Sequence, residues 1–216
     1  MENQAVENTS ENKLVIPYDK DRKNLTFYDT YVDMNGDVVK YDDIAVFQSA
    51  AFNNSSMIYI YFSKSFNYNF TLTTYDGNKH VFKRSGYSAY GIGTYKRIYN
   101  EYSEVAAPFY DIVLPKVAKR LISRIAEGAK ANISGLEITK DRLTCVRKKE
   151  TIVIDRSNFD RAVINSGMTS IAQIYIRDEK KPVFYANLNE PNARLIVPIV
   201  NYFFEYKPEN RGPAAQ

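Results

Sequence analysis

The first part of the chain, from Leu14 to Arg84, alternates short apolar runs with turn residues. The runs are rich in β-branched and aromatic side chains, which is typical of β-strands. Asn35-Gly36-Asp37 and Asp76-Gly77-Asn78 separate such runs, and glycine accepts the positive φ of tight hairpin turns. We predict strands at Leu14–Ile16, Leu25–Tyr31, Val38–Tyr41, Ile44–Gln48, Met57–Phe62, Asn69–Thr74 and His80–Lys83.

A helical pattern comes next. From Thr94 to Glu127, apolar residues recur every three or four positions, which places them on one face of a helix. Thr94 is a suitable N-cap, and Gly128 is a suitable C-terminal stop. Because proline inside a helix removes a hydrogen bond and clashes with the preceding turn, we expect a break or kink near Pro108. Pro115 fits the first turn or two of the second piece.

After Gly128 the strand pattern returns. Arg147–Glu150 and Arg177–Lys180 read as charged hairpin turns. A second helical pattern, interrupted by Pro198, runs over Asn192–Phe204. Its apolar face consists of Leu195, Ile196, Ile199, Val200 and Phe203. The strands predicted here are Leu136–Thr139, Leu143–Val146, Thr151–Ile154, Ser170–Ile176 and Pro182–Ala186.

Strands followed by a helix therefore occur twice, which predicts an α+β fold in two halves. We expect the boundary near Gly128–Gly135. The first domain would span residues 13–128 and the second 129–206, each large enough for a small core. The polar segments 1–12 and 207–216 lack apolar anchors, so we expect disordered tails there.

This order of elements resembles two pleckstrin-homology-like (PH-like) domains in tandem, as in uncharacterised bacterial proteins of this kind. Gly135–Thr139, Arg142–Val146 and Thr151–Asp155 look like the opening strands of such a domain, and Asn192–Phe204 looks like its capping helix. The resemblance implies two curved antiparallel sheets, each closed by a C-terminal helix. A PH-like domain usually has seven strands, of which the pattern predicts five in the second half. Its capping helix usually carries a tryptophan, which this chain lacks.

Composition narrows the chemistry. The 216 residues include one cysteine, Cys145, and one histidine, His80, which excludes an intrachain disulfide, a cysteine zinc cage and a two-histidine metal site. We expect no cofactor. Residues 1–90 hold 9 Lys+Arg and 11 Asp+Glu, whereas residues 91–216 hold 20 and 14. The basic second half could meet phosphates or an anionic membrane surface.

The start of the chain lacks the basic and apolar stretches of a secretory signal. The longest apolar runs, such as Met57–Phe62 and Leu195–Val200, are too short to cross a bilayer. A free Cys145 is compatible with a reducing compartment. We therefore expect a cytoplasmic protein, with a peripheral membrane location as the alternative.

Three features could carry catalysis, and each has a plainer interpretation. His80 would need a nucleophile and a carboxylate beside it, and it fits a strand-borne surface residue better. Gly86–Thr94 has glycines at the spacing of a phosphate loop without the lysine, so a connector is favoured. Asp42-Asp43 and Asp178-Glu179 are adjacent carboxylates that would diverge on a strand, which favours turns or edges.

Basic residues at the predicted turns of the second half are the candidate anion site. In membrane-binding PH domains the loop after the first strand carries Lys or Arg that bind inositol phosphates. Lys140 and Arg142 occupy the resembling position, and lysines also protect exposed edges and turns from association. The candidates are Lys140, Arg142, Arg147, Lys148 and Lys149.

The candidate protein contact is formed by Tyr59 and Tyr61. Their alternation with Ile58, Ile60 and Phe62 predicts a strand buried on one side, with the tyrosines on the other. The surrounding aromatic-rich segment, residues 57–70, holds a single cation. We therefore expect no nucleic-acid partner.

Taken together, the sequence favours a non-catalytic binding or scaffold module whose partner is a protein, with an anionic lipid or other phosphate-containing ligand second. The alternative is an enzyme in which His80 meets carboxylates at the domain junction. A third interpretation merges the halves into one large sheet of a structural or oligomeric component.

Overall fold

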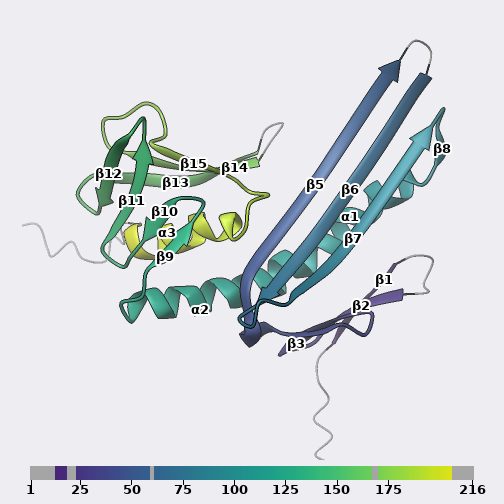
Figure 1. Cartoon of the computed structure of the whole chain (residues 1–216), viewed down its shortest axis with the longest axis horizontal. Coiled ribbons are helices and arrows are strands. Elements are labelled where there is room, and N and C mark those ends of the chain that lie inside the picture. The colour runs from purple at the N-terminus through teal and green to yellow at the C-terminus, as the bar shows by residue number, and fades with distance from the viewer. Residues whose placement is uncertain (1–12, 19–22, 59–60, 167–169, 206–216) are drawn as a thin grey trace, which may run out of the picture.

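A computed structural model describes residues 13–18, 23–58, 61–166 and 170–205. The fold is α+β, as predicted, and the antiparallel strands of these residues form four separate sheets (Figure 1). The interpretation that merges both halves into one large sheet is therefore wrong. No helix in the described ranges is long and apolar enough to span a membrane.

The first sheet is a four-stranded meander made of short strands. Its strands are β1 (Leu14–Tyr18), β2 (Lys23–Phe27), β3 (Tyr31–Met34) and β4 (Val38–Lys40), hydrogen-bonded in that order. Asn35 and Gly36 connect β3 to β4 with φ values of 63° and 95°. This left-handed pair is typical of a tight hairpin turn, and the prediction of a turn at this place is confirmed.

The second sheet contains three long strands. After a single 3-10 turn, η1 (Tyr41–Asp43), the sheet is built from β5 (Ile44–Ile58), β6 (Tyr61–Thr74), β7 (Lys79–Ala89) and β8 (Ile92–Gly93). The separate strands predicted at Ile44–Gln48 and Met57–Phe62 are wrong. Asn53–Ser56 contains neither glycine nor proline, so the strand continues through these polar residues while paired to β6.

A bent helical segment packs on this sheet. It consists of α1 (Tyr95–Pro108), a π-helical turn η2 (Phe109–Val113) and α2 (Leu114–Ala126). The irregularity predicted near Pro108 is this π-helical turn, beyond which α2 runs in a different direction from α1 (Figure 1). Pro115 lies in the first turn of α2, as predicted. Gly128 ends the segment with a φ of 100° and an N–H that bonds the Ile125 carbonyl.

The described residues of the second half form seven strands in two sheets. The first is β9 (Ala131–Ile133), β10 (Leu136–Ile138), β11 (Arg142–Arg147) and β12 (Glu150–Asp155). The other is β13 (Phe159–Ser166), β14 (Ser170–Ile176) and β15 (Phe184–Asn187). The strands predicted from the sequence do not include β9 and β13. β9 is only three residues long, and a register shift between Phe159 and Arg161 in β13 breaks its alternation.

The last elements of the described residues are a 3-10 turn, η3 (Ala193–Leu195), and α3 (Ile196–Phe204). Every residue of the predicted apolar face of this helix is buried. Pro198 lies in the first turn of α3, where its missing N–H costs no helical hydrogen bond.

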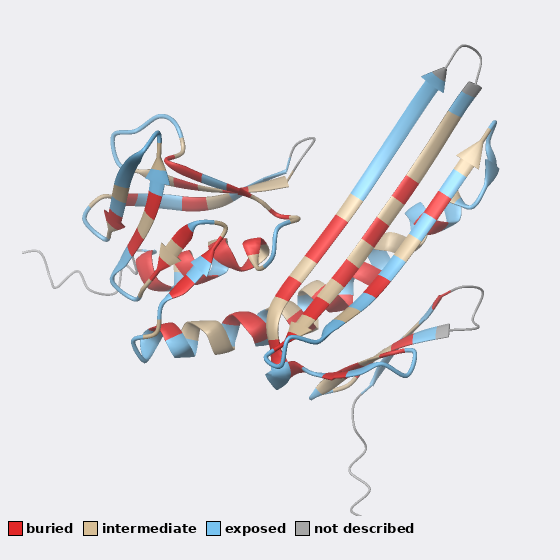
Figure 2. Ribbon diagram, viewed as in Figure 1, coloured by how far each residue is buried: buried red, intermediate tan, exposed pale blue. Residues whose placement is uncertain are grey.

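The buried residues of both halves form one continuous hydrophobic cluster. In the first half, Phe70 of β6 stacks on Phe109 of the π-helical turn, with ring centroids 4.1 Å apart. Nearer the far end of the sheet, Gly86 of β7 lets α1 approach, since a Cβ there would meet the Ile98 Cβ at 2.8 Å. Figure 2 shows that burial ends well before the far tip of β5.

Candidate protein-interaction site

The lower part of β5 is an edge strand that the second half of the chain covers. The Asn192 N–H donates to the Phe47 carbonyl at 2.8 Å, and the Asn192 Oδ1 accepts the Phe47 N–H at 2.8 Å. The Gln48 side chain donates to the Asn189 carbonyl at 2.8 Å. Arg194 donates to the Ser49 hydroxyl at 2.6 Å. The loop after β15 therefore acts as a short partner for the base of this edge.

These bonds establish which residues of β5 face outward. Phe47 directs its N–H and C=O away from β6, and backbone direction alternates along a strand. The later residues at odd positions in β5 therefore also direct their N–H and C=O groups away from β6. Four of them lie beyond the covering loop and the buried Ser49, and we call their outward-facing backbone groups the β5 edge: Ala51, Asn53, Ser55 and Met57.

The β5 edge has no backbone partner among the described residues, and it is long. Residues 52–57 are exposed. Their side chains include Phe52 at 52% and Met57 at 73% exposure, on opposite faces of the sheet. On the face that carries α1, the Tyr95 hydroxyl donates to the Asn53 side chain at 3.2 Å, which places the start of α1 beside the strand.

The β5 edge also lacks the usual protection against strand pairing. No charged residue or proline occurs in β5, or anywhere between Ile44 and Ser63. Every other edge strand of the four described sheets carries such a residue or is at most four residues long. The protecting residues are Pro17 in β1, Glu150 and Asp155 in β12, and Asp160 and Arg161 in β13. An open, uncharged edge is a template for another strand.

A buried polar cluster ties α1 to the sheet that presents this edge. Glu101 of α1 accepts two hydrogen bonds from Arg84 of β7, at 2.9 and 3.2 Å, and one from the Tyr68 hydroxyl of β6 at 2.9 Å. Burial and the negative charge of Glu101 raise the pKa of Tyr68, so its hydroxyl remains a donor. The cluster joins three elements and holds the long strands in place.

The structure locates the two tyrosines predicted to contact a protein only in part. Tyr59 lies outside the described residues. Tyr61 is the first residue of β6, where its backbone pairs with Ile58, the last residue of β5. The predicted buried face is wrong at Phe62, which is 43% exposed, because Ile58 ends β5 and Phe62 belongs to β6, so the two residues are not in one strand.

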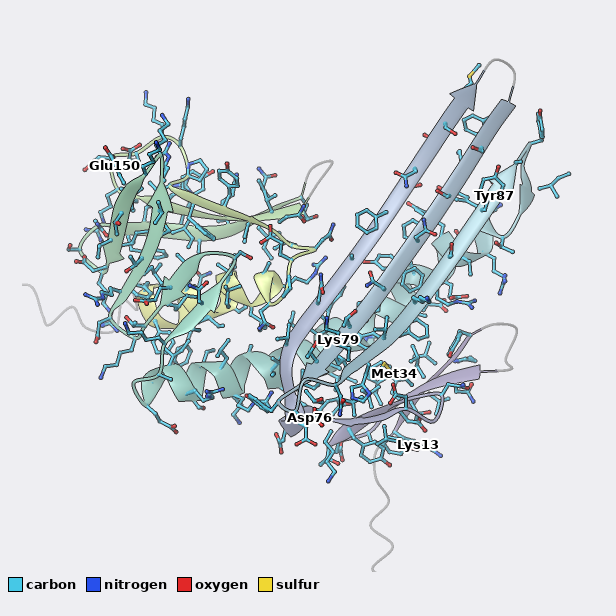
Figure 3. The ribbon with its side chains drawn as sticks, in the orientation of Figure 1. Lys13, Met34, Asp76, Lys79, Tyr87 and Glu150 are labelled. Carbon is cyan, nitrogen blue, oxygen red and sulfur yellow. The ribbon has the colours of Figure 1, made fainter. Side chains whose placement is uncertain are left out.

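The five basic candidates lie at the two ends of β11. Lys140 and Arg142 are at the β10–β11 turn, and Lys148 and Lys149 form the β11–β12 turn with φ values of 51° and 71°. Arg147 precedes this second turn. The two ends are separated by about 17 Å at the rise of an extended strand. Arg142 lies opposite Asp155, and Arg147 lies opposite Glu150, which Figure 3 labels.

His80 is the second residue of β7, and its side chain faces the first sheet. Its Nδ1 lies 2.8 Å from a carboxylate oxygen of Asp37 in the β3–β4 turn. His80 lines an open groove of about 520 Å³. The groove is lined by Val38, Val39, Lys40, Asp43, Thr74, Tyr75, Asp76, Asn78 and His80. Asp76 and Lys79, labelled in Figure 3, mark the β6–β7 turn beside it.

The carboxylates near His80 are engaged in turns. Asp76 accepts hydrogen bonds from Thr74 and Asn78, which lower the pKa of its carboxyl group. Asp43 belongs to η1. The other predicted carboxylate pair, Asp178-Glu179, belongs to the second half of the chain, where Asp178 adopts a left-handed φ of 65° in the turn after β14. Within the described ranges, no group of three or more His, Cys, Asp or Glu side chains could hold a metal ion.

The one cysteine of the chain, Cys145, does not lie in the same sheet as His80. Cys145 is buried in β11, a strand of a different sheet. Burial raises the pKa of its thiol, which disfavours the reactive thiolate. The glycine-rich segment Gly86–Thr94 also has a structural role, since it contains the end of β7, β8 and the N-cap of α1.

Sequence reasoning missed the β5 edge, although a signal existed. A quarter of the chain is charged, so the 20 residues from Ile44 to Ser63 would contain about five charges on average, and they contain none.

No protein-family model matches this chain, and no curated protein matches it.

Proposed function

We propose that the chain is a non-catalytic protein-binding module, or scaffold, made of two PH-like domains. Its partner binds as an added strand on the β5 edge. In this mode of recognition, main-chain hydrogen bonds supply affinity and alternate side chains supply specificity.

The order of elements supports the PH-like part of the proposal. Each half has a four-stranded meander, then a second antiparallel sheet, then a helix. The helix of the second half, α3, buries Phe203 and Phe204 where such a domain usually places its tryptophan. The seven strands β9 to β15 match the usual number.

One observation carries the binding part. The β5 edge is exposed from residue 52 onward, unpaired in the described chain and free of charge, while the same strand already accepts a backbone partner at Phe47. An edge that pairs with Asn192 at its base can pair with another extended segment farther along. Exposed Phe52 and Met57 would then become covered on the two faces of the sheet.

Proline scanning of the edge tests this function. Ser55→Pro removes one outward N–H and leaves the bonds between β5 and β6 intact. Val81→Pro is the matched control, because Val81 is an exposed, outward-facing residue on the opposite side of the sheet. Proteins captured from the native cell extract by the wild-type chain would be purified and titrated against each variant.

We expect Ser55→Pro to weaken binding at least about tenfold and Val81→Pro to leave it unchanged. Met57→Lys provides a second edge variant that alters no backbone group, and circular dichroism verifies the fold of each protein. Equal affinity for the wild type, Ser55→Pro and Met57→Lys would overturn the proposal.

A second candidate function is contact with an anionic headgroup. Lys148 and Lys149 are exposed at the tip of a tight hairpin, where both side chains can reach phosphates. Lys148→Glu with Lys149→Glu should abolish sedimentation with vesicles that contain anionic lipid. Sedimentation that is absent in the parent, or unchanged in the double variant, would exclude this function.

A further inference from the structure

We propose that the partner strand on the β5 edge is the β5 strand of a second copy of this chain, paired antiparallel about a two-fold axis. This inference rests on the proposed function, because it names the occupant of the same edge. The result would be a homodimer with one sheet continuous across both subunits.

The free length of the strand sets the register. The outward-facing backbone of β5 that has no partner in the described chain runs from Ala51, which is half-buried, to the exposed Met57, and its midpoint is Asn54. Full antiparallel overlap of two copies therefore places the two-fold axis at Asn54. Ala51 then pairs with Met57 of the other copy, and Asn53 pairs with Ser55 of the other copy, each pair exchanging two backbone hydrogen bonds.

Both ends of the strand are compatible with this register. The covering loop ends the available edge at Phe47 and the buried Ser49. In the proposed register the last residue of the other copy's strand, Ile58, lies opposite Ala50. Each strand, β5 ending at Ile58, thus ends before it would lie opposite Ser49 and Phe47 of the other copy.

The side chains of the two strands are complementary in size. On the face that carries α1, Met57 lies beside the small Ala51 of the other copy. On the opposite face, Phe52 lies beside Ser56 of the other copy. The two Asn54 side chains face each other across the axis, where their amides can hydrogen-bond. The exposed apolar side chains of the strand are thereby covered without a clash between large residues.

Charge favours a second copy over a different partner. An uncharged strand carries no feature that would select a basic or an acidic segment, and it does not repel itself. The other long edge strands of the chain carry charges or a proline, so β5 of another copy is the unprotected edge that this chain itself supplies.

Charge swapping at the two-fold axis provides the test. The measurement is sedimentation equilibrium of the full chain over a wide concentration range, where the mean mass should rise from 24.8 kDa toward twice that value. Asn54→Glu and Asn54→Lys each place like charges opposite one another, and we expect each to raise the dissociation constant about tenfold. An equal mixture of the two variants should regain the wild-type constant or better. Val81→Glu and Val81→Lys are the matched controls, for which we expect no change.

The outcomes separate this inference from the function on which it rests. A wild-type chain that stays monomeric, or a dimer indifferent to Asn54 charges, overturns the homodimer. If the wild type is monomeric but binds another protein in a manner sensitive to Ser55→Pro, the proposed function stands without the homodimer. If neither kind of binding is sensitive to the edge, both fail.

Discussion

Asn192 and Phe47, which lie 145 residues apart, exchange two hydrogen bonds of 2.8 Å. Asn192 adopts a left-handed φ of 58°, which asparagine tolerates better than most residues. Its backbone N–H and its side-chain oxygen together imitate one residue of a neighbouring strand. The second half of the chain thus closes the base of the β5 edge and leaves the rest open.

Substitutions at Asn192 should follow this geometry. Asn192→Gly keeps the backbone conformation but loses the side-chain hydrogen bond, so we expect it to lower the free energy of unfolding by about 1 kcal/mol. Asn192→Asp keeps an oxygen acceptor and should lower it by less. Asn192→Ala loses the bond and also strains the left-handed position, so we expect about 2 kcal/mol. Urea denaturation of the three variants measures the order, and a reversed order would refute this role for the Asn192 side chain.

Loss of Glu101 should destabilise the first half strongly. Glu101→Ala leaves the Arg84 guanidinium without its bidentate partner at a site where the Arg84 side chain is only 14% exposed, so we expect a loss of about 3 kcal/mol. Tyr68→Phe removes one hydrogen bond from the same cluster and should cost about 1 kcal/mol. Chemical denaturation compares them, and equal losses would show that the ion pair contributes little.

High pH should unfold the protein through buried tyrosines. Burial raises the pKa of Tyr41 and of Tyr68 above the ordinary value, and the nearby Asp29 and Glu101 add to the respective shifts. Because the folded pKa exceeds the unfolded one, this stabilisation is complete below about pH 10 and is lost as pH rises further.

Each of the two tyrosines should remove about 1.4 kcal/mol of unfolding free energy per pH unit above 10. Denaturation measured at several alkaline pH values gives the slope. Tyr41→Phe and Tyr68→Phe should each make the slope shallower. A slope that is unchanged in both variants would mean that the two hydroxyls ionise equally in the folded and unfolded chain.

Gly86 should resist enlargement even though its backbone is that of an ordinary strand. A Cβ there would lie 2.8 Å from the Ile98 Cβ and 3.0 Å from the Tyr95 Cα, so Gly86→Ala must push α1 away from β7. We expect a destabilisation of about 1–3 kcal/mol, typical of overpacking. Ile98→Ala in the same background should not recover the loss, because alanine keeps the Cβ at position 98 and the Tyr95 Cα belongs to the backbone. Thermal or urea denaturation measures both variants. If Gly86→Ala is neutral, the close packing of α1 on β7 is not rigid.

The fold class and many of its elements followed from local pattern. The hairpin turns at Gly36 and Gly77, the helix stop at Gly128 and the irregularity near Pro108 are signals of single residues, and each is present. The buried face of α3 followed from apolar periodicity. These features depend on backbone chemistry that nearby residues determine, so the sequence alone was sufficient.

Pairing between distant segments accounts for what was missed. Asn53–Ser56 has weak strand propensity, and it is extended because β6 pairs with it along its whole length. Likewise, nothing in the local sequence around Phe47 or around Asn192 predicts that these two residues are in contact. The candidate edge could have been found from the missing charges, yet only the sheet order shows that β5 lies at an edge.

Amide hydrogen exchange along β5 tests the central claim, that the β5 edge pairs with another strand, most directly. At low concentration the inward-facing amides of Phe52 and Asn54 should be protected by β6, whereas those of Asn53 and Ser55 should exchange fast. With rising chain concentration, or after addition of a captured partner, the Asn53 and Ser55 amides should become protected. Fast exchange at Asn53 and Ser55 under every one of these conditions would contradict the claim.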